Sequence, residues 1–222
     1  MIVAVGNQKG GVGKTTVACN VAAAFHHGAL APTVLVDADP QGSAVQWGAS
    51  GLLGPSVLPL PLEEGTEPSA WVRAVLALAA DARAVVVDLP PQRGAAMAAA
   101  VSVCDLLLVP VTPSGADLRA TLSTLELVRD ARQRLGSDRP RVLLVPSRVD
   151  RRTAAGREVE AVLHEFGEIV GPMVGQRSAF VDAFAAQGWI GATHPRTAGH
   201  REIEALAAVV RRIAAKAEKE RT

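Results

Sequence analysis

The chain has 222 residues, of which 49% are hydrophobic and only 3% aromatic, so we expect one domain with a core of Val, Leu, Ile and Ala. A formal net charge of +1 excludes a strongly basic or acidic protein as a whole. No apolar run reaches the roughly 18 residues of a membrane span, and the chain opens on a strand-like run, so we expect a cytoplasmic protein without a signal peptide.

Short apolar runs alternate along the chain with longer helical stretches. The predicted strands span residues 2–5, 33–36, 84–87, 106–111 and 142–145. The predicted helices span residues 15–27, 70–80, 95–103, 117–135, 156–166, 179–187 and 199–218. Between them, residues 48–68 are rich in Gly and Pro and predict a surface loop with one edge strand at 56–60. This alternation predicts a single α/β domain over residues 1–222, doubly wound, with a mostly parallel sheet and helices on both faces.

The strongest motif follows the first predicted strand and opens the first predicted helix. It reads Lys9-Gly10-Gly11-Val12-Gly13-Lys14-Thr15-Thr16. Glycines let a loop turn tightly and bring its N–H groups to phosphates, and the helix N-terminus adds partial positive charge. We expect Lys14 to bridge the β- and γ-phosphates, the Thr15 hydroxyl to bind Mg²⁺, and Thr16 to reach the α-phosphate. The pattern departs from an ordinary phosphate loop, because Gln8 replaces its first glycine and a second lysine, Lys9, follows.

This loop resembles the deviant Walker A group of ParA and MinD ATPases, and the resemblance continues over nearly the whole chain. Residues 37–42 resemble the switch segment of that family, and residues 85–91 resemble its Walker B strand and the following turn. Residues 110–114 and 176–182 resemble the short ParA branch typified by ParF. The resemblance implies a P-loop NTPase that binds ATP and Mg²⁺, closes into a homodimer over ATP, and hydrolyses it slowly, as a switch does.

The resemblance also implies roles for individual residues. Lys9 is expected to cross the dimer interface to the partner's nucleotide, where a cation offsets repulsion between two ATP-bearing faces. Asp39 resembles the residue that positions the attacking water, and with Lys9 and Lys14 it forms the predicted catalytic set. Asp37 is expected to support Mg²⁺ or the switch loop, and Asp88 to hold a Mg²⁺-bound water beside Thr15. Either Asp37 or Asp39 could instead merely cap the next turn.

Residues 146–150 follow the fifth predicted strand, where the family contacts the base. Pro146 and Arg148 are the expected adenine contacts, although a plain structural turn is equally consistent for Arg148. Guanine-specific switches usually carry N-K-x-D at this point, whereas residues 147–150 read Ser-Arg-Val-Asp. The resemblance therefore favours ATP over GTP.

Residues 129–157 carry nine Arg and three Asp, and this block predicts an anion-facing surface or a solvated helix face. Arg177 matches by resemblance a DNA-contacting arginine of the family, and Arg151 and Arg152 are further candidates from the block. These features favour a nucleoid-associated ATPase that partitions or positions plasmid or chromosomal DNA. It would bind duplex DNA without sequence preference and release it when a ParB-like or small centromere-binding partner stimulates hydrolysis.

Three alternatives stay open at this point. A MinD-like membrane-associated positioning ATPase needs an amphipathic C-terminal anchor, whereas the stripe of residues 203–217 is modest in bulk and the tail 215–222 is polar, which favours a helix docked on the core. An iron–sulfur reductase needs suitably spaced cysteines, whereas Cys19 and Cys104 are expected to be buried thiols. A metabolic ATP-dependent enzyme on the same fold needs substrate residues that the sequence does not identify.

Overall fold

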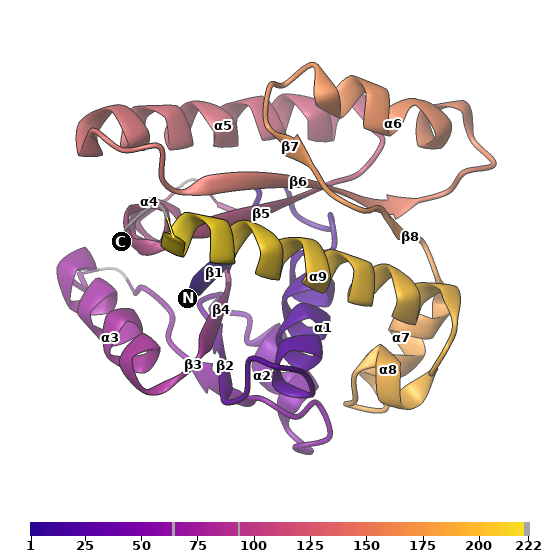
Figure 1. Ribbon diagram of the computed structural model, residues 1–222, viewed down its shortest axis with the longest axis horizontal. Coiled ribbons are helices and arrows are strands. Elements are labelled where there is room, and N and C mark those ends of the chain that lie inside the picture. The colour runs from indigo at the N-terminus through magenta and orange to yellow at the C-terminus, as the bar shows by residue number, and fades with distance from the viewer. Residues whose placement is uncertain (64, 93, 220–222) are drawn as a thin grey trace.

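The computed structural model describes residues 1–63, 65–92 and 94–219 (Figure 1). The strands are β1 (Ile2–Val5), β2 (Thr33–Asp37), β3 (Ser56–Pro59), β4 (Ala84–Asp88), β5 (Leu106–Val111), β6 (Arg141–Val149), β7 (Ile169–Val170) and β8 (Val174–Gly175). The helices are α1 (Lys14–His26), α2 (Ser43–Gly48), α3 (Pro68–Asp81), α4 (Ala95–Val103), α5 (Gly115–Leu135), α6 (Ala154–His164), α7 (Ser178–Ala185), α8 (Ile190–Thr193) and α9 (Ala198–Lys219).

The strands form one sheet in the order β3-β2-β4-β1-β5-β6-β7, and β8 pairs with β6. Every pair in this sheet is parallel. Asp88, the last residue of β4, is in register with Val5 of β1 and with Asp37 of β2. The strands β1, β2 and β4 therefore end at one edge of the sheet, where a doubly wound fold binds its ligands. The predicted fold class is confirmed.

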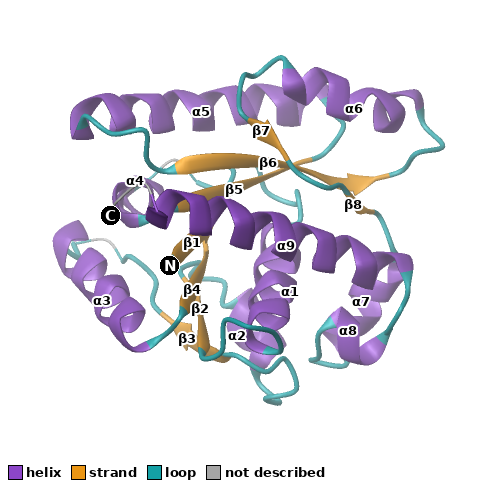
Figure 2. Cartoon of the chain, viewed as in Figure 1, coloured by secondary structure: helices purple, strands orange, loops and turns teal. Residues whose placement is uncertain are grey.

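Helices cover both faces of the sheet (Figure 2). Successive residues of a strand point to opposite faces, so Val3 and Val5 join one core and Ile2 and Ala4 the other. The first core is closed by side chains from α1, α2, α7, α8 and α9, and the second by side chains from α3, α4, α5 and α6. Both cores are mainly aliphatic, as the low aromatic content requires.

The structure differs from the predicted elements where tertiary contacts lengthen a strand or stabilise very short elements. The fifth predicted strand runs on to Val149 in β6, so the expectation that Pro146 and Arg148 follow the strand is wrong. The cause is β8, which pairs with the end of β6 through Ser147 and Val174. The short elements α2, α8, β7 and β8 were not predicted, because their sequences are too short to carry a period.

The C-terminal helix α9 docks on the core, which confirms that interpretation of its apolar stripe. Ile203, Leu206, Ala207 and Val210 are fully buried and belong to the first core, and α9 packs against α1. The end of the predicted stripe, Ala217, and the tail beyond it lie outside the residues whose side chains are described. Among residues 1–63, 65–92 and 94–219, no helix is both long and apolar enough to cross a bilayer.

Candidate functional site: a phosphate loop and its neighbouring pocket

The predicted phosphate loop lies between the end of β1 and the start of α1. Gly11 and Gly13 adopt left-handed φ angles of +79° and +91°, a region that favours glycine. At Gly13 a Cβ atom would also lie 2.9 Å from the Ser147 hydroxyl oxygen, so any other residue there would require Ser147 to move. Helix α1 has no side-chain cap at its N-terminus, which leaves its first N–H groups free for an anion.

Lys14 lies beneath this loop, with only 7% of its surface exposed. Its ammonium donates a 3.0 Å hydrogen bond to the carbonyl oxygen of Lys9. Burial lowers the pKa of Lys14, and the carboxylates of Asp88 and Asp39 counteract that shift. The buried cation is thus surrounded by a backbone oxygen and two carboxylates, and a phosphate at the loop would add the negative charge that favours its protonated form.

Asp88 is the group whose environment fits a magnesium site best. It is 1% exposed, and neither carboxylate oxygen has a hydrogen-bond partner among the described residues. Burial raises the pKa of Asp88 to about 7, and the neighbouring Thr15 hydroxyl acts against this rise. An unpartnered buried carboxylate is costly, and a cation or its bound water would satisfy it. In the described part of the chain no cluster of three or more His, Cys, Asp or Glu could hold a metal, so Mg²⁺ here needs phosphate oxygens as well.

Asp37 and Asp39 shape the segment that follows β2. Asp37 is buried and accepts hydrogen bonds from the backbone N–H groups of Asp39 at 3.1 Å and Val45 at 2.9 Å. Burial raises the pKa of Asp37, and these backbone donors act against the rise. Asp39 is half-buried and accepts from the N–H group of Gln41 at 3.0 Å. Asp37 therefore anchors the segment to α2, while one oxygen of Asp39 has no partner in the described chain.

Lys9 is exposed, and its ammonium forms no hydrogen bond or ion pair with any described residue. Its backbone is held by Asn7, a residue that sequence reasoning missed. Asn7 is fully buried; its side-chain oxygen accepts from the Lys9 N–H group at 3.3 Å, and its amide donates to the Pro110 carbonyl at 2.9 Å and the Thr121 hydroxyl at 3.2 Å. These partners tie the phosphate loop to β5 and α5. They lie more than 100 residues away, so no local pattern could reveal them.

A cavity of about 530 Å³ adjoins the helix end of the loop. Its lining joins Gly13, Thr15 and Thr16 to α2 and to the segment that enters α7. The remaining lining residues are Ser43, Trp47, Ser147, Arg148, Val174, Gly175, Gln176, Arg177, Ser178, Phe180, Val181 and Phe184. The Trp47 and Phe184 rings pack edge to face at 5.2 Å, so one wall is aromatic.

This lining bears on the two predicted adenine contacts. Arg148 lies at the cavity with a left-handed φ of +52°, and its guanidinium donates a 2.7 Å hydrogen bond to the Gly11 carbonyl. Pro146 is buried in β6 opposite Val111 and is not part of the lining. The segment 176–184 contributes more of this wall than the segment 146–150, and sequence reasoning did not assign it to the nucleotide.

The three predicted DNA-binding arginines, Arg151, Arg152 and Arg177, line one groove of about 1030 Å³. Arg201 lines it as well, and we call it the arginine groove. Arg152 binds Asp150 through two parallel contacts of 2.9 and 2.7 Å, and Arg151 lies 4.0 Å from Glu160. Arg177 is paired with Glu202 of α9. The structure thus brings the three together, each with a carboxylate beside it.

The profile of the CobQ/CobB/MinD/ParA nucleotide binding domain matches residues 3–187. The maintenance of carboxysome distribution protein A of Halothiobacillus neapolitanus is 32% identical over 169 residues, 74% of each chain. The apo McdA structure from Cyanothece superposes with a TM-score of 0.78 at 17% identity, covering 94% of this chain and 98% of that one. The MinD structure from Pyrococcus horikoshii, complexed with Mg-ADP, gives 0.73 at 17% identity, covering 97% and 98%.

Proposed function

Because the chain belongs to the CobQ/CobB/MinD/ParA nucleotide binding domain family, we propose that it is an ATPase whose ATP-bound homodimer positions a cargo in the cell. The observation that carries this proposal is the pairing of two lysines in one loop, Lys14 buried beneath the phosphates' expected position and Lys9 exposed at its outer side. A loop that served only one subunit's nucleotide would have no use for the second cation.

Within one subunit, the loop N–H groups and Lys14 bind the triphosphate, and Thr15 and Asp88 hold Mg²⁺. Bound Mg²⁺ supplies neutralisation of the charge that develops on the phosphates. Asp39 orients the attacking water through its free oxygen, while Asp37 anchors the segment that carries Asp39. Phosphoryl transfer depends mostly on positioning and charge neutralisation, so this small set of groups is sufficient for slow turnover.

Between subunits, Lys9 reaches the partner's phosphates. Its ammonium has no partner among the described residues of its own subunit, and Asn7 holds its backbone in place. The two reciprocal charge-assisted hydrogen bonds, from each Lys9 to the other subunit's phosphates, form together only when both subunits carry nucleotide. ATP binding is thereby converted into dimerisation, and hydrolysis reverses it.

Adenine, rather than guanine, fills the cavity beside α7. The exposed ring of Phe184, which packs against buried Trp47, provides a stacking surface, and Arg148 joins the cavity to the loop through the Gly11 carbonyl. The Mg-ADP bound to the related MinD structure supports the same nucleotide class for this chain.

The dimer binds duplex DNA without sequence preference through the arginine groove. Arg151, Arg152 and Arg201 are exposed there, and guanidinium groups contact phosphates without reading bases. A partner protein of the ParB-like kind stimulates hydrolysis and so releases the DNA. The Halothiobacillus relative, whose name refers to carboxysome distribution, favours a second form of this function, in which the cargo is a protein assembly.

The test is a gel shift of arbitrary duplex DNA by the purified protein, with and without ATP and Mg²⁺. We expect a shift that needs ATP and weakens steeply as salt rises, together with ATP hydrolysis that DNA and partner accelerate. An absence of DNA binding at low salt with saturating ATP would contradict the DNA part of the proposal. A failure to hydrolyse ATP under any condition would contradict the ATPase itself.

A further inference from the structure

The arginine groove is nearly neutral in the structure, although four arginines line it. Its other charged side chains are Asp150, Glu160 and Glu202, so three carboxylates offset four guanidinium groups. A surface with one net positive charge attracts DNA phosphates weakly. The groove therefore contains arginines that could bind an anion, but the neighbouring carboxylates largely cancel their charge.

Glu202 is the carboxylate placed most specifically. One of its oxygens accepts hydrogen bonds from the Gly175 N–H group at 3.1 Å and from the Arg177 Nε at 3.0 Å, and the other accepts from Arg177 Nη2. This is the bidentate geometry that a guanidinium otherwise offers to a phosphate. Glu202 thus occupies Arg177 as an external phosphate would.

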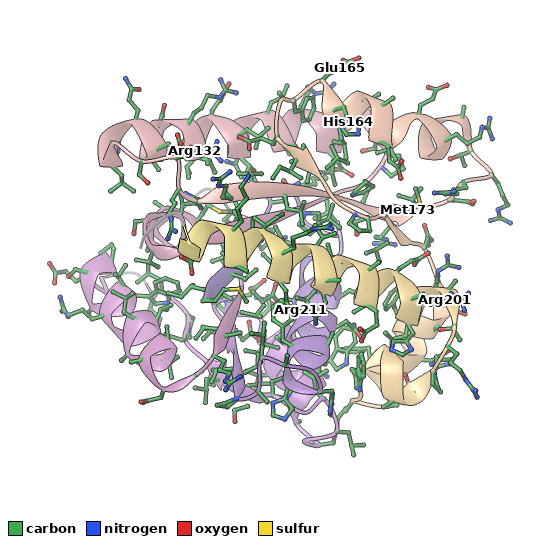
Figure 3. The ribbon with its side chains drawn as sticks, in the orientation of Figure 1. Arg132, His164, Glu165, Met173, Arg201 and Arg211 are labelled. Carbon is green, nitrogen blue, oxygen red and sulfur yellow. The ribbon has the colours of Figure 1, made fainter. Side chains whose placement is uncertain are left out.

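The surroundings of Arg177 are shaped for this pair. A Cβ atom on Gly175 would lie 3.0 Å from the guanidinium, and one on Gly199 would lie 3.3 Å from Cδ of Arg177, so the two glycines leave room for the side chain. Arg177 remains 37% exposed, whereas Glu202 is 18% exposed. A phosphate can therefore reach Arg177 from the groove, where Arg177 is the more exposed member of the pair. Met173 and Arg201, labelled in Figure 3, line the same groove near β8 and at the start of α9.

The same segment also borders the nucleotide cavity. Gly175, Gln176, Arg177 and Ser178 line both the groove and the cavity beside the phosphate loop. Arg177 is the N-cap residue of α7, whose side chains Phe180 and Phe184 form part of the cavity wall. One segment thus connects the nucleotide cavity with the Arg177–Glu202 pair.

We propose that Glu202 is an internal competitor of DNA: in the nucleotide-free chain it occupies Arg177, and in the DNA-binding state a backbone phosphate of duplex DNA takes its place. This inference rests on the proposed DNA-binding function and adds a regulatory residue to it. Where two binding sites are coupled, the change in affinity is commonly about 5- to 150-fold.

The test compares Glu202→Gln with Glu204→Gln. Both changes remove one negative charge from α9, but Glu204 faces His200 at 3.7 Å and is not part of the groove lining. In Glu202→Gln the amide oxygen still accepts from the Gly175 N–H group, so the fold is retained. Without nucleotide, Glu202→Gln should bind a short arbitrary duplex about 10-fold more tightly than the wild type. Its DNA affinity should also fall more steeply with salt concentration, by about one phosphate contact. Glu204→Gln should show neither change.

Two further variants complete the test. Glu202→Asp keeps the charge but is one methylene shorter, so it should also release Arg177 and raise DNA binding. In an Arg177→Ala background, Glu202→Gln should give no gain. Equal binding by Glu202→Gln and Glu204→Gln, or a gain that persists without Arg177, would overturn the proposal.

Retention on immobilised heparin, measured without nucleotide, separates this proposal from the proposed function. Stronger retention of Glu202→Gln than of Glu204→Gln would support the internal competitor even in a protein whose ATP-bound form failed to shift DNA. Equal retention of the two variants would count against it, whatever the ATP-bound protein does.

Discussion

The ammonium of Lys14 donates its hydrogen bond to the carbonyl oxygen of Lys9 at 3.0 Å, so the buried lysine of the loop is bonded to the backbone of the exposed one. An ammonium has three N–H donors, so Lys14 can bind a phosphate while it keeps this bond. The two lysines therefore have separable effects: Lys14 on nucleotide binding within a subunit, and Lys9 on the contact between subunits. The first two predictions separate them.

Lys14→Ala should abolish measurable ATP binding. The change removes the only cation beneath the loop in the described chain and loses charge-assisted bonds to phosphate, worth about 3 kcal/mol or about 100-fold in affinity. Isothermal titration with Mg-ATP measures this directly. Unchanged affinity would remove the phosphate-loop assignment.

Lys9→Ala should leave the ATP affinity of the monomer within about twofold but weaken the ATP-bound dimer by at least tenfold, about 1.4 kcal/mol. Lys9 is exposed and does not contact its own subunit's described side chains through its ammonium. Sedimentation velocity with saturating ATP and Mg²⁺ measures the dimer, and Lys9→Arg is the control that keeps the charge. A wild type that stays monomeric under these conditions would end the switch hypothesis.

Asp39→Ala should still form ATP-dependent dimers but lose turnover on the order of 100-fold or more, because a group that positions or deprotonates the attacking water contributes that much. The matched control is Asp37→Asn, which should instead loosen the segment and its link to α2, since Asp37 accepts from two backbone N–H groups. Phosphate release gives the rate, and sedimentation gives the dimer. Normal hydrolysis by Asp39→Ala would show that another group orients the water.

The sequence was sufficient for the parts of this molecule that local pattern determines. The strand ends at Asp37 and Asp88 follow from buried apolar runs, and parallel pairing places those residues in register. Side-chain contacts between segments that are distant in the sequence could not be predicted. The Arg177–Glu202 pair spans 25 residues and the Asn7–Thr121 bond 114, and no period or motif records either contact.

The cavity proposed for the base shows the same limit of sequence analysis. Helix α7 was predicted, but its place beside the phosphate loop depends on β8, a two-residue strand that pairs with the end of β6. A strand this short carries no hydrophobic alternation. The sequence analysis therefore assigned only the segment 146–150 to the base and did not single out Trp47 and Phe184, which line the cavity.

Asp88→Asn should stabilise the nucleotide-free protein at pH 8 and not at pH 4. Burial raises the pKa of Asp88 from 3.8 to about 7, so the folded state holds a proton that the unfolded state releases, and stability falls as pH rises from about 4 to about 7. A rise of the pKa from 3.8 to about 7 corresponds to about 4 kcal/mol. Leaving an amide buried without partners costs about 1–3 kcal/mol, so the net gain at pH 8 is about 2 kcal/mol.

With Mg-ATP bound at pH 8, the wild type should be more stable than Asp88→Asn. The wild type gains stability as its ionised Asp88 holds the metal, whereas Asp88→Asn gains much less, because a ligand stabilises the folded state only as far as it binds. Thermal unfolding at pH 4, 6 and 8, with and without Mg-ATP, measures both effects. An Asp88→Asn protein that was no more stable than the wild type at pH 8 would show that a partner satisfies this carboxylate. Equal stabilisation of both proteins by Mg-ATP would place the metal elsewhere.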